Sequence, residues 1–122
     1  MNKVAVIVAE GFEEGETLTI IDIISRAGIV CDSFGLEKEV IGSHQITLQC
    51  DEVLNERVLD YDMIVLPGGL PGATNLRDCD ELIQYLKEMN NQNKYVCAMC
   101  AAPIELDKAG LLNDKNYTAY VG

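Results

Sequence analysis

Short runs of consecutive apolar residues, each followed by a segment with helical spacing, restrict the possible folds of this sequence more than any other feature. Residues 4–8 are all apolar and include three valines. Such a run is typical of a strand buried on both faces of a parallel sheet. Residues 16–27 follow, with apolar residues at helical spacing: Leu18, Ile21 and Ile24. Gly28 stands where a glycine commonly ends a helix, so the segment predicts a strand, a turn and a helix.

The same alternation continues to the end of the chain. Strands are predicted at 29–35, 62–66, 94–99 and 116–121, helices at 81–89 and 103–108, and a hairpin insertion at 40–48. Strands that alternate with helices indicate an α/β fold, a doubly wound and mostly parallel sheet with right-handed crossovers. With 122 residues, 48% of them hydrophobic, the chain is long enough for one domain, so residues 1–122 are expected to form a single α/β unit.

The end of the sequence is unusual for such a unit. The strand predicted at 116–121 is apolar, and no helix follows it to cover that face of the sheet. We therefore expect this chain to be the N-terminal portion of a larger α/β unit, with the C-terminal part missing or supplied by a separate C-terminal chain.

Charge and cysteine content exclude some partners. The formal net charge of -11 argues against nucleic acid and against anionic membrane surfaces, because phosphates would be repelled. The chain opens directly on a short strand pattern, which is neither a signal peptide nor a membrane span. The cysteines are an odd set of 5 without regular spacing, which suits thiols in a reducing compartment. A cytoplasmic location is therefore expected.

Cys100 follows the predicted strand 94–99 and precedes a predicted helix. This arrangement resembles a nucleophile elbow, in which small neighbours such as Ala98 and Ala102 permit a sharp turn. Pro103 suits a first helical turn. A thiol at a helix N-terminus is stabilised as thiolate, so Cys100 is the predicted reactive cysteine. The alternative is a small buried apolar residue.

Cys97 and Cys100 form a Cys-x-x-Cys pair, which suggests a redox motif or half of a zinc site. Residues three apart at the end of a strand point to opposite faces, and no second cysteine/histidine pair exists for tetrahedral zinc. We therefore expect Cys97 to be a packing residue in the core, and we expect no metal.

The glycine loop at 67–73 has neither the Gly-x-Gly-x-x-Gly pattern nor a Walker lysine. The first turn instead carries carboxylates that would repel a pyrophosphate: Glu10, Glu13, Glu14 and Glu16. Nucleotide binding is therefore rejected. One glycine N–H of this loop and the Ala101 N–H are candidates for an oxyanion hole, the alternative being a tight turn.

Of these glutamates, most are expected to be solvated surface charges. Glu16, at the opening of the first helix, is the candidate proton shuttle, because a carboxyl group beside a thiolate can remain protonated. His44 is the only histidine and lies in the predicted hairpin, so a surface position or a subunit contact is expected for it.

Several segments together resemble the ThiJ/PfpI superfamily, and within it the parkinsonism-associated deglycase branch. They are 9–17, 26–28, 42–44, 62–69 and 98–103, in the order and spacing of that family. The resemblance implies a flavodoxin-like sandwich related to class I glutamine amidotransferases, usually a homodimer. It also implies that Cys100 is the nucleophile and oxidation-sensitive cysteine, with Glu16 as its partner carboxyl.

The same resemblance makes Gly69 and Ala101 the oxyanion donors. It places His44 and Arg26 near the dimer interface, so His44 is expected to approach a pocket of the neighbouring subunit. Two departures are visible. The chain is shorter than members of this branch, and Tyr120 stands where many of them carry a histidine.

Activities attributed to the family need no cofactor. They are glyoxalase action on methylglyoxal, deglycation of early glycation adducts, and peptidase or chaperone action in more distant members. The leading hypothesis is a Cys100-dependent enzyme acting on a small aldehyde or glycated substrate. The alternatives are an oxidative-stress sensor or chaperone-type protein without turnover, and an inactive fragment.

Overall fold

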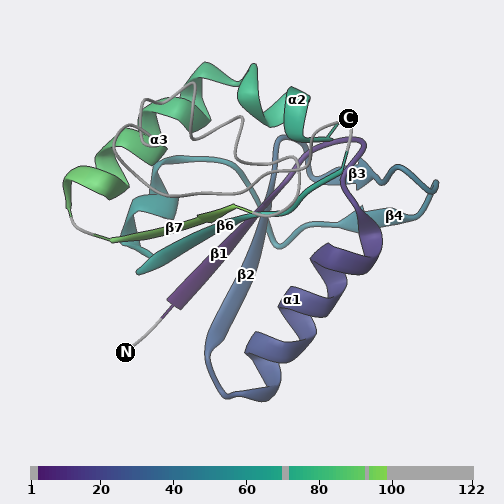
Figure 1. Cartoon of the computed structure of the whole chain (residues 1–122), viewed down its shortest axis with the longest axis horizontal. Helices are drawn as coiled ribbons and strands as arrows, with labels where there is room; N and C mark the ends of the chain where they lie inside the picture. The colour runs from purple at the N-terminus through teal and green to yellow at the C-terminus, as the bar shows by residue number, and fades with distance from the viewer. Residues whose placement is uncertain (1–2, 70–71, 93, 99–122) are drawn as a thin grey trace.

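The structure is a computed structural model, and it describes residues 3–69, 72–92 and 94–98. Within that part of the chain, a central parallel sheet separates two helical layers, with α1 on one side and α2 and α3 on the other (Figure 1). The helix predicted at 103–108 and the strand predicted at 116–121 lie outside the described residues.

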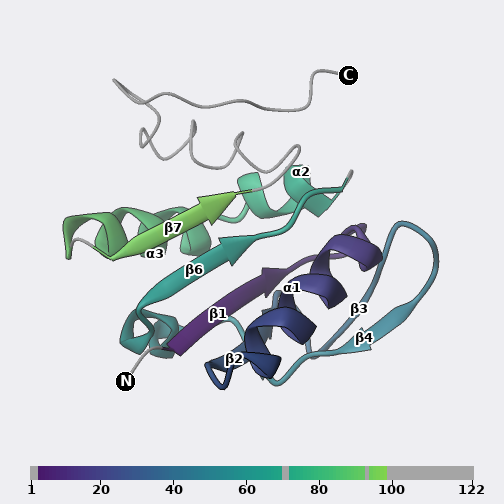
Figure 2. The same cartoon turned by 60° about the horizontal axis from the view of Figure 1, so that its bottom comes forward.

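The sheet contains five strands in the order β5-β2-β1-β6-β7. Their bounds are Lys3–Val8 for β1, Val30–Gly35 for β2, Glu52–Val53 for β5, Met63–Leu66 for β6 and Tyr95–Ala98 for β7. All neighbouring pairs are parallel, as the arrows of β1, β6 and β7 show in Figure 2. The chain adds strands first on one side of β1 and then on the other, so the strand order reverses between β1 and β6. Open α/β sheets bind ligands at the carboxyl ends of the strands at such a point.

The other elements among the described residues are helices and one hairpin. The helices are α1 (Glu14–Arg26), α2 (Gly72–Arg77), α3 (Asp80–Asn91) and the 3-10 helix η1 (Glu56–Asp60). The strands β3 (Glu39–Ile41) and β4 (Thr47–Gln49) pair antiparallel as a separate hairpin, which confirms the predicted insertion. Figures 1 and 2 both place this hairpin beside the first turn of α1.

Strand β1 is buried on both faces, which confirms the interpretation of its continuous apolar run. Val4, Val6 and Val8 pack in the cluster that α1 covers. Ala5 and Ile7 pack on the other face, in the cluster that includes Leu82 and Leu86 of α3. Side chains alternate between the faces of a strand, so only a sheet covered on both sides buries every residue of such a run.

One apolar residue of α1 is exposed, and one expectation about burial was wrong. Leu18 is 43% exposed, because the stripe of α1 that faces the sheet runs through the fully buried Thr17 and the packed Ile21 and Ile24. Cys97 is exposed rather than a core residue. Along β7, Val96 and Ala98 pack against the core and Cys97 alternates to the opposite face.

The sequence patterns also missed three short elements. Strand β5 has 2 residues and η1 has 5, too few for a periodic signal. Helix α2 begins at Gly72, in a stretch whose glycines and proline indicate a loop. None of the helices among the described residues is long and apolar enough to cross a membrane.

Candidate functional site

Hydrogen bonds of the Gly68 backbone join the segments that follow β1 and β6. The Gly68 N–H donates to Glu16 Oε1 at 3.2 Å, and the Gly68 carbonyl accepts from the Glu13 N–H at 3.1 Å. Glu16 lies in the first turn of α1, and Glu13 is the residue before that helix. The predicted glycine loop and the predicted proton shuttle are therefore in direct contact.

Gly69 occupies a position that only glycine fits. Its φ of +103° lies in the left-handed region. A Cβ atom there would lie 2.6 Å from the Glu13 nitrogen and 3.0 Å from the Gly11 carbonyl oxygen. A side chain would force the 11–13 turn and the loop apart, so Gly69 allows the two segments to approach closely.

The contacts of Gly68 also determine the direction of the Gly69 N–H. In a trans peptide, this N–H points opposite to the Gly68 carbonyl, and that carbonyl is directed at the Glu13 N–H. The Gly69 N–H therefore points away from the 11–13 turn. No backbone carbonyl within residues 3–69, 72–92 and 94–98 accepts a hydrogen bond from it.

Cys100 and Ala101 lie outside the described residues, and the description of β7 ends at Ala98. Ala98 is paired in register with Leu66, the last residue of β6. The sequence reaches Gly68 two residues after Leu66 and Cys100 two residues after Ala98. Gly68 and Cys100 therefore each follow, by two residues along the sequence, one member of a registered pair at the carboxyl ends of β6 and β7.

Three of the other cysteines are unsuited to act as nucleophiles at neutral pH. Burial, with smaller contributions from Asp32 and Asp51, raises the pKa of Cys31 to about 11. Burial also raises the pKa of Cys50 and of Cys97. Since the thiolate is the reactive form, these thiols remain mostly protonated.

Glu14 is a buried, hydrogen-bonded carboxylate that the sequence patterns missed. Expected among the solvated glutamates, it is only 4% exposed. Its carboxylate accepts from the backbone N–H groups of His44 at 2.8 Å and Ile46 at 3.1 Å. The His44 Nδ1 lies 3.0 Å from Glu14 Oε1. Burial alone would raise the pKa of Glu14, but these hydrogen bonds outweigh it and lower the pKa to about 2.

The only sequence signal for this contact is Gly42. A Cβ atom on Gly42 would lie 2.3 Å from Glu14 Oε2, so the hairpin turn can cover the carboxylate only with a glycine there. Gly42 could not be linked to Glu14 from the sequence, because the two residues are far apart along the chain.

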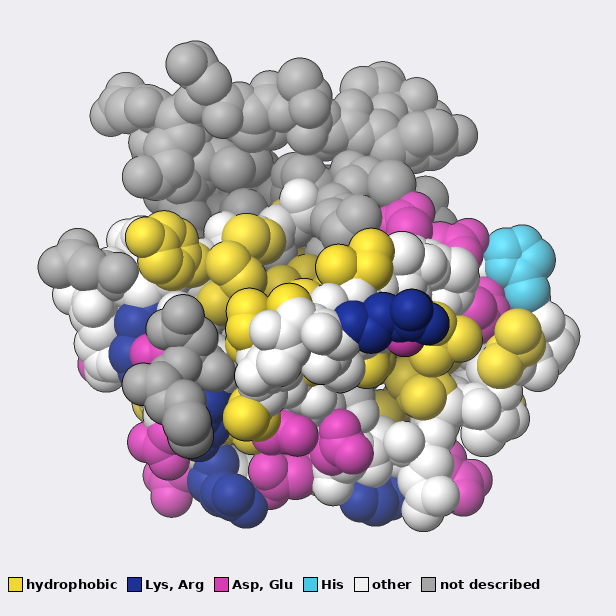
Figure 3. Space-filling model, turned by 90° about the horizontal axis from the view of Figure 1, so that it is seen from below, with side chains coloured by type: hydrophobic (Ala, Val, Ile, Leu, Met, Phe, Trp, Pro, Cys, Tyr) yellow, Lys and Arg dark blue, Asp and Glu magenta, His cyan; other side chains and the backbone are white. Residues whose placement is uncertain are grey.

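The His44 side chain is 71% exposed, and it is the single cyan side chain at the edge of the face in Figure 3. An ionised Glu14 only accepts hydrogen bonds, so the contact identifies Nδ1 as the protonated ring nitrogen. Within its own chain, His44 therefore contacts Glu14 rather than Glu16. Its expected approach to a neighbouring subunit remains a prediction.

Glu13, Glu14 and His44 each offer one ligand atom, and these atoms lie within 4.8 Å of one another. A metal ion there would need the Glu14 oxygens that already accept hydrogen bonds from the hairpin turn. The group is thus explained as a structural contact between α1 and the hairpin.

Comparison with known proteins extends the resemblance over the whole chain. The sequence profile of the DJ-1/PfpI family matches residues 2–122. Protein DJ-1 homolog B of Arabidopsis thaliana is 38% identical over 122 residues, which are 97% of this chain and 28% of that protein. The Parkinson disease protein 7 homolog of Danio rerio is 32% identical over 124 residues, which are 98% of this chain and 66% of the relative.

Solved structures agree with the fold. Oxidized DJ-1 of Toxoplasma gondii superimposes with a TM-score of 0.92 at 36% identity, covering 98% of this chain and 67% of that one. Drosophila melanogaster DJ-1beta gives a TM-score of 0.84 at 34% identity, covering 91% of this chain and 62% of that one. The chain thus has the predicted flavodoxin-like α/β fold, and it spans two thirds or less of the length of these relatives.

Proposed function

The chain belongs to the DJ-1/PfpI family, and on that premise we propose that it is a cysteine-dependent, cofactor-free enzyme acting on small 2-oxoaldehydes or early glycation adducts. One observation carries the proposal. The backbone N–H and carbonyl of Gly68 are hydrogen-bonded to Glu16 and Glu13. A carboxyl group and a Gly69 N–H that points away from the 11–13 turn therefore lie together at the carboxyl edge of the sheet.

In the proposed mechanism, the Cys100 thiolate adds to the aldehyde carbon. A carbon–sulfur bond forms, and the carbonyl electron pair moves to oxygen, giving a hemithioacetal oxyanion. The N–H groups of Gly69 and Ala101 stabilise this oxyanion. Glu16 donates and accepts the protons.

With methylglyoxal, a proton then moves from C1 to C2, which leaves a thioester on Cys100. Water hydrolyses the thioester to a 2-hydroxy acid and frees the thiol. The net reaction adds one water molecule and needs no external oxidant or reductant. We also propose a cytoplasmic setting, since a reducing compartment keeps the nucleophile as a thiol.

The register of the strands supports this assignment. Leu66 and Ala98 are paired, and the proposed oxyanion donor and nucleophile follow them at matching distances along the sequence. Glu16 is anchored on the same side by its bond from Gly68. The raised pKa of Cys31, Cys50 and Cys97 argues against these three cysteines as the nucleophile.

The test is the rate of methylglyoxal consumption by the purified protein and its variants. Cys100→Ala should abolish turnover, and Glu16→Gln should reduce it by about a hundredfold or more, as for a lost general acid or base. Cys97→Ala and Glu88→Gln are matched controls, because both residues are exposed and lie outside the proposed site. Equal rates for all five proteins would refute the enzymatic proposal.

The second candidate is a stress sensor in which Cys100 is oxidised to a sulfinate without turnover. One solved relative, that of Toxoplasma gondii, is described as oxidized. In this candidate a protonated Glu16 donates a hydrogen bond to the sulfinate. A two-oxygen gain confined to Cys100 after mild peroxide treatment, together with negligible aldehyde turnover, would favour the sensor over the enzyme.

We further propose that the chain forms a homodimer through α1 and the β3–β4 hairpin. Apolar side chains are exposed on both elements: Leu18, Ile23 and Ile46. Analytical ultracentrifugation should show a dimer that Ile23→Lys dissociates. Val53→Lys, on the edge strand β5, is the matched control because Val53 is also exposed. A monomeric wild-type protein would contradict this arrangement.

A further inference from the structure

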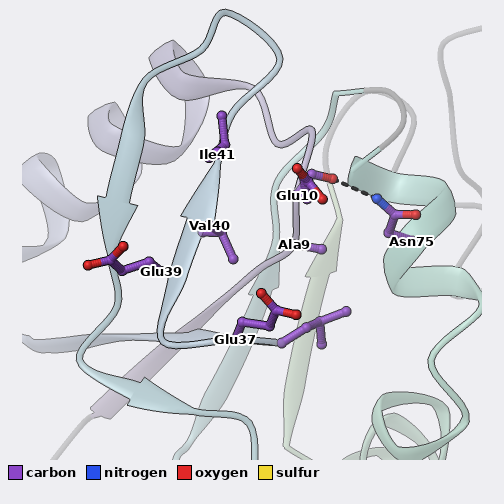
Figure 4. Close-up of a pocket in the computed structure, with 8 residues that line it drawn as sticks. Ala9, Glu10, Glu37, Glu39, Val40, Ile41 and Asn75 are labelled. Carbon is purple, nitrogen blue, oxygen red and sulfur yellow. Dashed lines mark hydrogen bonds between the residues drawn. The ribbon is translucent and has the colours of Figure 1, made fainter.

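A cavity of about 340 Å³ lies between the hairpin and the carboxyl ends of β1 and β2. Ala9 and Val40 (Figure 4), together with Leu36, supply apolar surface. The Glu10 carboxylate enters from one end and the Glu37 carboxylate from the other. Glu39 also lines the cavity, with its carboxylate directed away from it. The cavity is therefore an apolar groove with two negative charges directed into it.

Among the described residues, these charges have no cationic partner. Glu10 and Glu37 form no ion pair among the described residues. Lys38, the residue after Glu37, donates instead to the Asp51 carbonyl oxygen at 2.8 Å. Within the described part of the chain, no lysine or arginine lines the groove, so its potential attracts a cation.

A second cavity, of about 310 Å³, continues the first. The two share Glu10, Ile41 and Asn75 as lining residues. Its other lining is neutral and polar, with the Ser43 and Gln45 side chains beside glycine backbone. Asn75 fixes the shared wall, because its Nδ2 donates to the Glu10 carbonyl oxygen at 2.7 Å.

The chemistry of the two cavities specifies one occupant. A guanidinium group is weakly hydrated, binds carboxylates and packs on apolar surfaces through its faces and its alkyl stem. These properties match the acidic, apolar first cavity. Apart from the shared Glu10 and Ile41, the second cavity is lined by neutral polar groups, which suit the amide groups of an extended peptide backbone. We propose that this groove binds an arginine side chain within an extended peptide.

The proposal concerns binding, and it holds whether or not Cys100 turns over a substrate. Binding is therefore measured with the Cys100→Ser variant, by fluorescence anisotropy of a labelled, end-blocked peptide with one arginine between glycines. The matched peptide carries citrulline, which keeps the shape and removes the charge. The arginine peptide should bind more tightly, and raising the salt concentration should weaken it because surface charge is screened.

Variants of the groove test its position. Glu10→Gln and Glu37→Gln should each weaken binding roughly two- to fivefold, as for single surface charge pairs. Glu88→Gln is the matched control, since it removes the same charge from an exposed carboxylate on α3 that lines neither cavity. Ile41→Arg should abolish binding by placing a cation of the chain itself in the groove. Circular dichroism confirms that each variant is folded.

The outcomes are distinct. Tighter binding of the arginine peptide, weakened more by Glu37→Gln than by Glu88→Gln, supports the groove. Equal binding of the arginine and citrulline peptides overturns it. So does an equal loss in Glu37→Gln and Glu88→Gln, which would indicate attraction to the net negative charge alone. Free agmatine, which has the arginine side chain without a backbone, should bind more weakly than the peptide. Equal affinity would overturn the role of the second cavity.

Discussion

The buried Glu14 carboxylate accepts the backbone N–H of His44 at 2.8 Å, with the His44 ring nitrogen Nδ1 at 3.0 Å. This relationship attaches the hairpin turn to the first turn of α1. The same helical turn holds Gly68 through Glu16. The hairpin and the glycine loop are therefore positioned by carboxylates two residues apart on one helix.

Replacing this carboxylate by an amide should loosen the hairpin. In Glu14→Gln, the new NH2 group would face backbone N–H donors that now bind oxygen, so donors would be left without acceptors. We expect the melting temperature to fall by several degrees, measured by circular dichroism. Glu88→Gln makes the same charge change at an exposed site on α3 and should leave it nearly unchanged. Equal melting temperatures for both variants would contradict the anchoring role.

The contribution of Glu14 should depend on pH. Its pKa is lowered from 4.5 to about 2 in the folded protein. A lowered pKa stabilises the folded state fully above the unfolded value, and this stabilisation is lost as pH falls toward the folded value. The difference in unfolding free energy between the wild type and Glu14→Gln should thus be constant near neutral pH and shrink below pH 4.5. Urea unfolding at pH 7, 5 and 3 measures it. A difference in unfolding free energy that grows on acidification would contradict the lowered pKa of Glu14.

Gly69→Ala should affect both stability and the proposed site. The positive φ and the 2.6 Å approach to the Glu13 nitrogen leave no space for a methyl group. We expect a loss of about 1–3 kcal/mol, typical of a residue forced into a strained backbone. Turnover should fall because the Gly69 N–H rotates away. Gly15→Ala, in the first turn of α1, is the control and should change stability by less than about 1 kcal/mol. Similar effects at both glycines would contradict the close approach.

The thiols should react in a defined order with iodoacetamide. Cys50, 1% exposed and with a raised pKa, should stay unmodified until the protein unfolds. Cys97 is exposed as a residue, but partial desolvation of its thiol raises the pKa, so it should react slowly at pH 7 and faster as pH rises. Cys31, with a pKa of about 11, should show the same direction at higher pH. Peptide mapping by mass spectrometry at pH 7, 8 and 9 gives the rates. Rapid modification of Cys31 at pH 7 would contradict the assigned environment.

Local sequence patterns determined much of the fold. The uninterrupted run at 4–8 required burial on both faces, because neighbouring side chains of a strand point to opposite sides. The periodicity of residues 81–89 identified a helix whose Leu82 and Leu86 are buried in the structure. These predictions hold because each depends on residues close together along the chain. Helix α2 and strand β5 were missed because short elements depend on tertiary contacts more than on their own pattern.

By itself, the sequence determined the parallel α/β architecture and proposed Cys100, Glu16, Gly69 and Ala101 as a site. Only the tertiary structure decided what each glutamate of the first turn does. Glu14 is buried under the hairpin, Glu16 binds the Gly68 N–H, and Glu10 lines an open groove. Four identical side chains in one short segment carry no local signal that distinguishes them. The distinction comes from backbone donors and cavities formed by residues about 25 to 65 positions away, whose approach depends on the packed sheet.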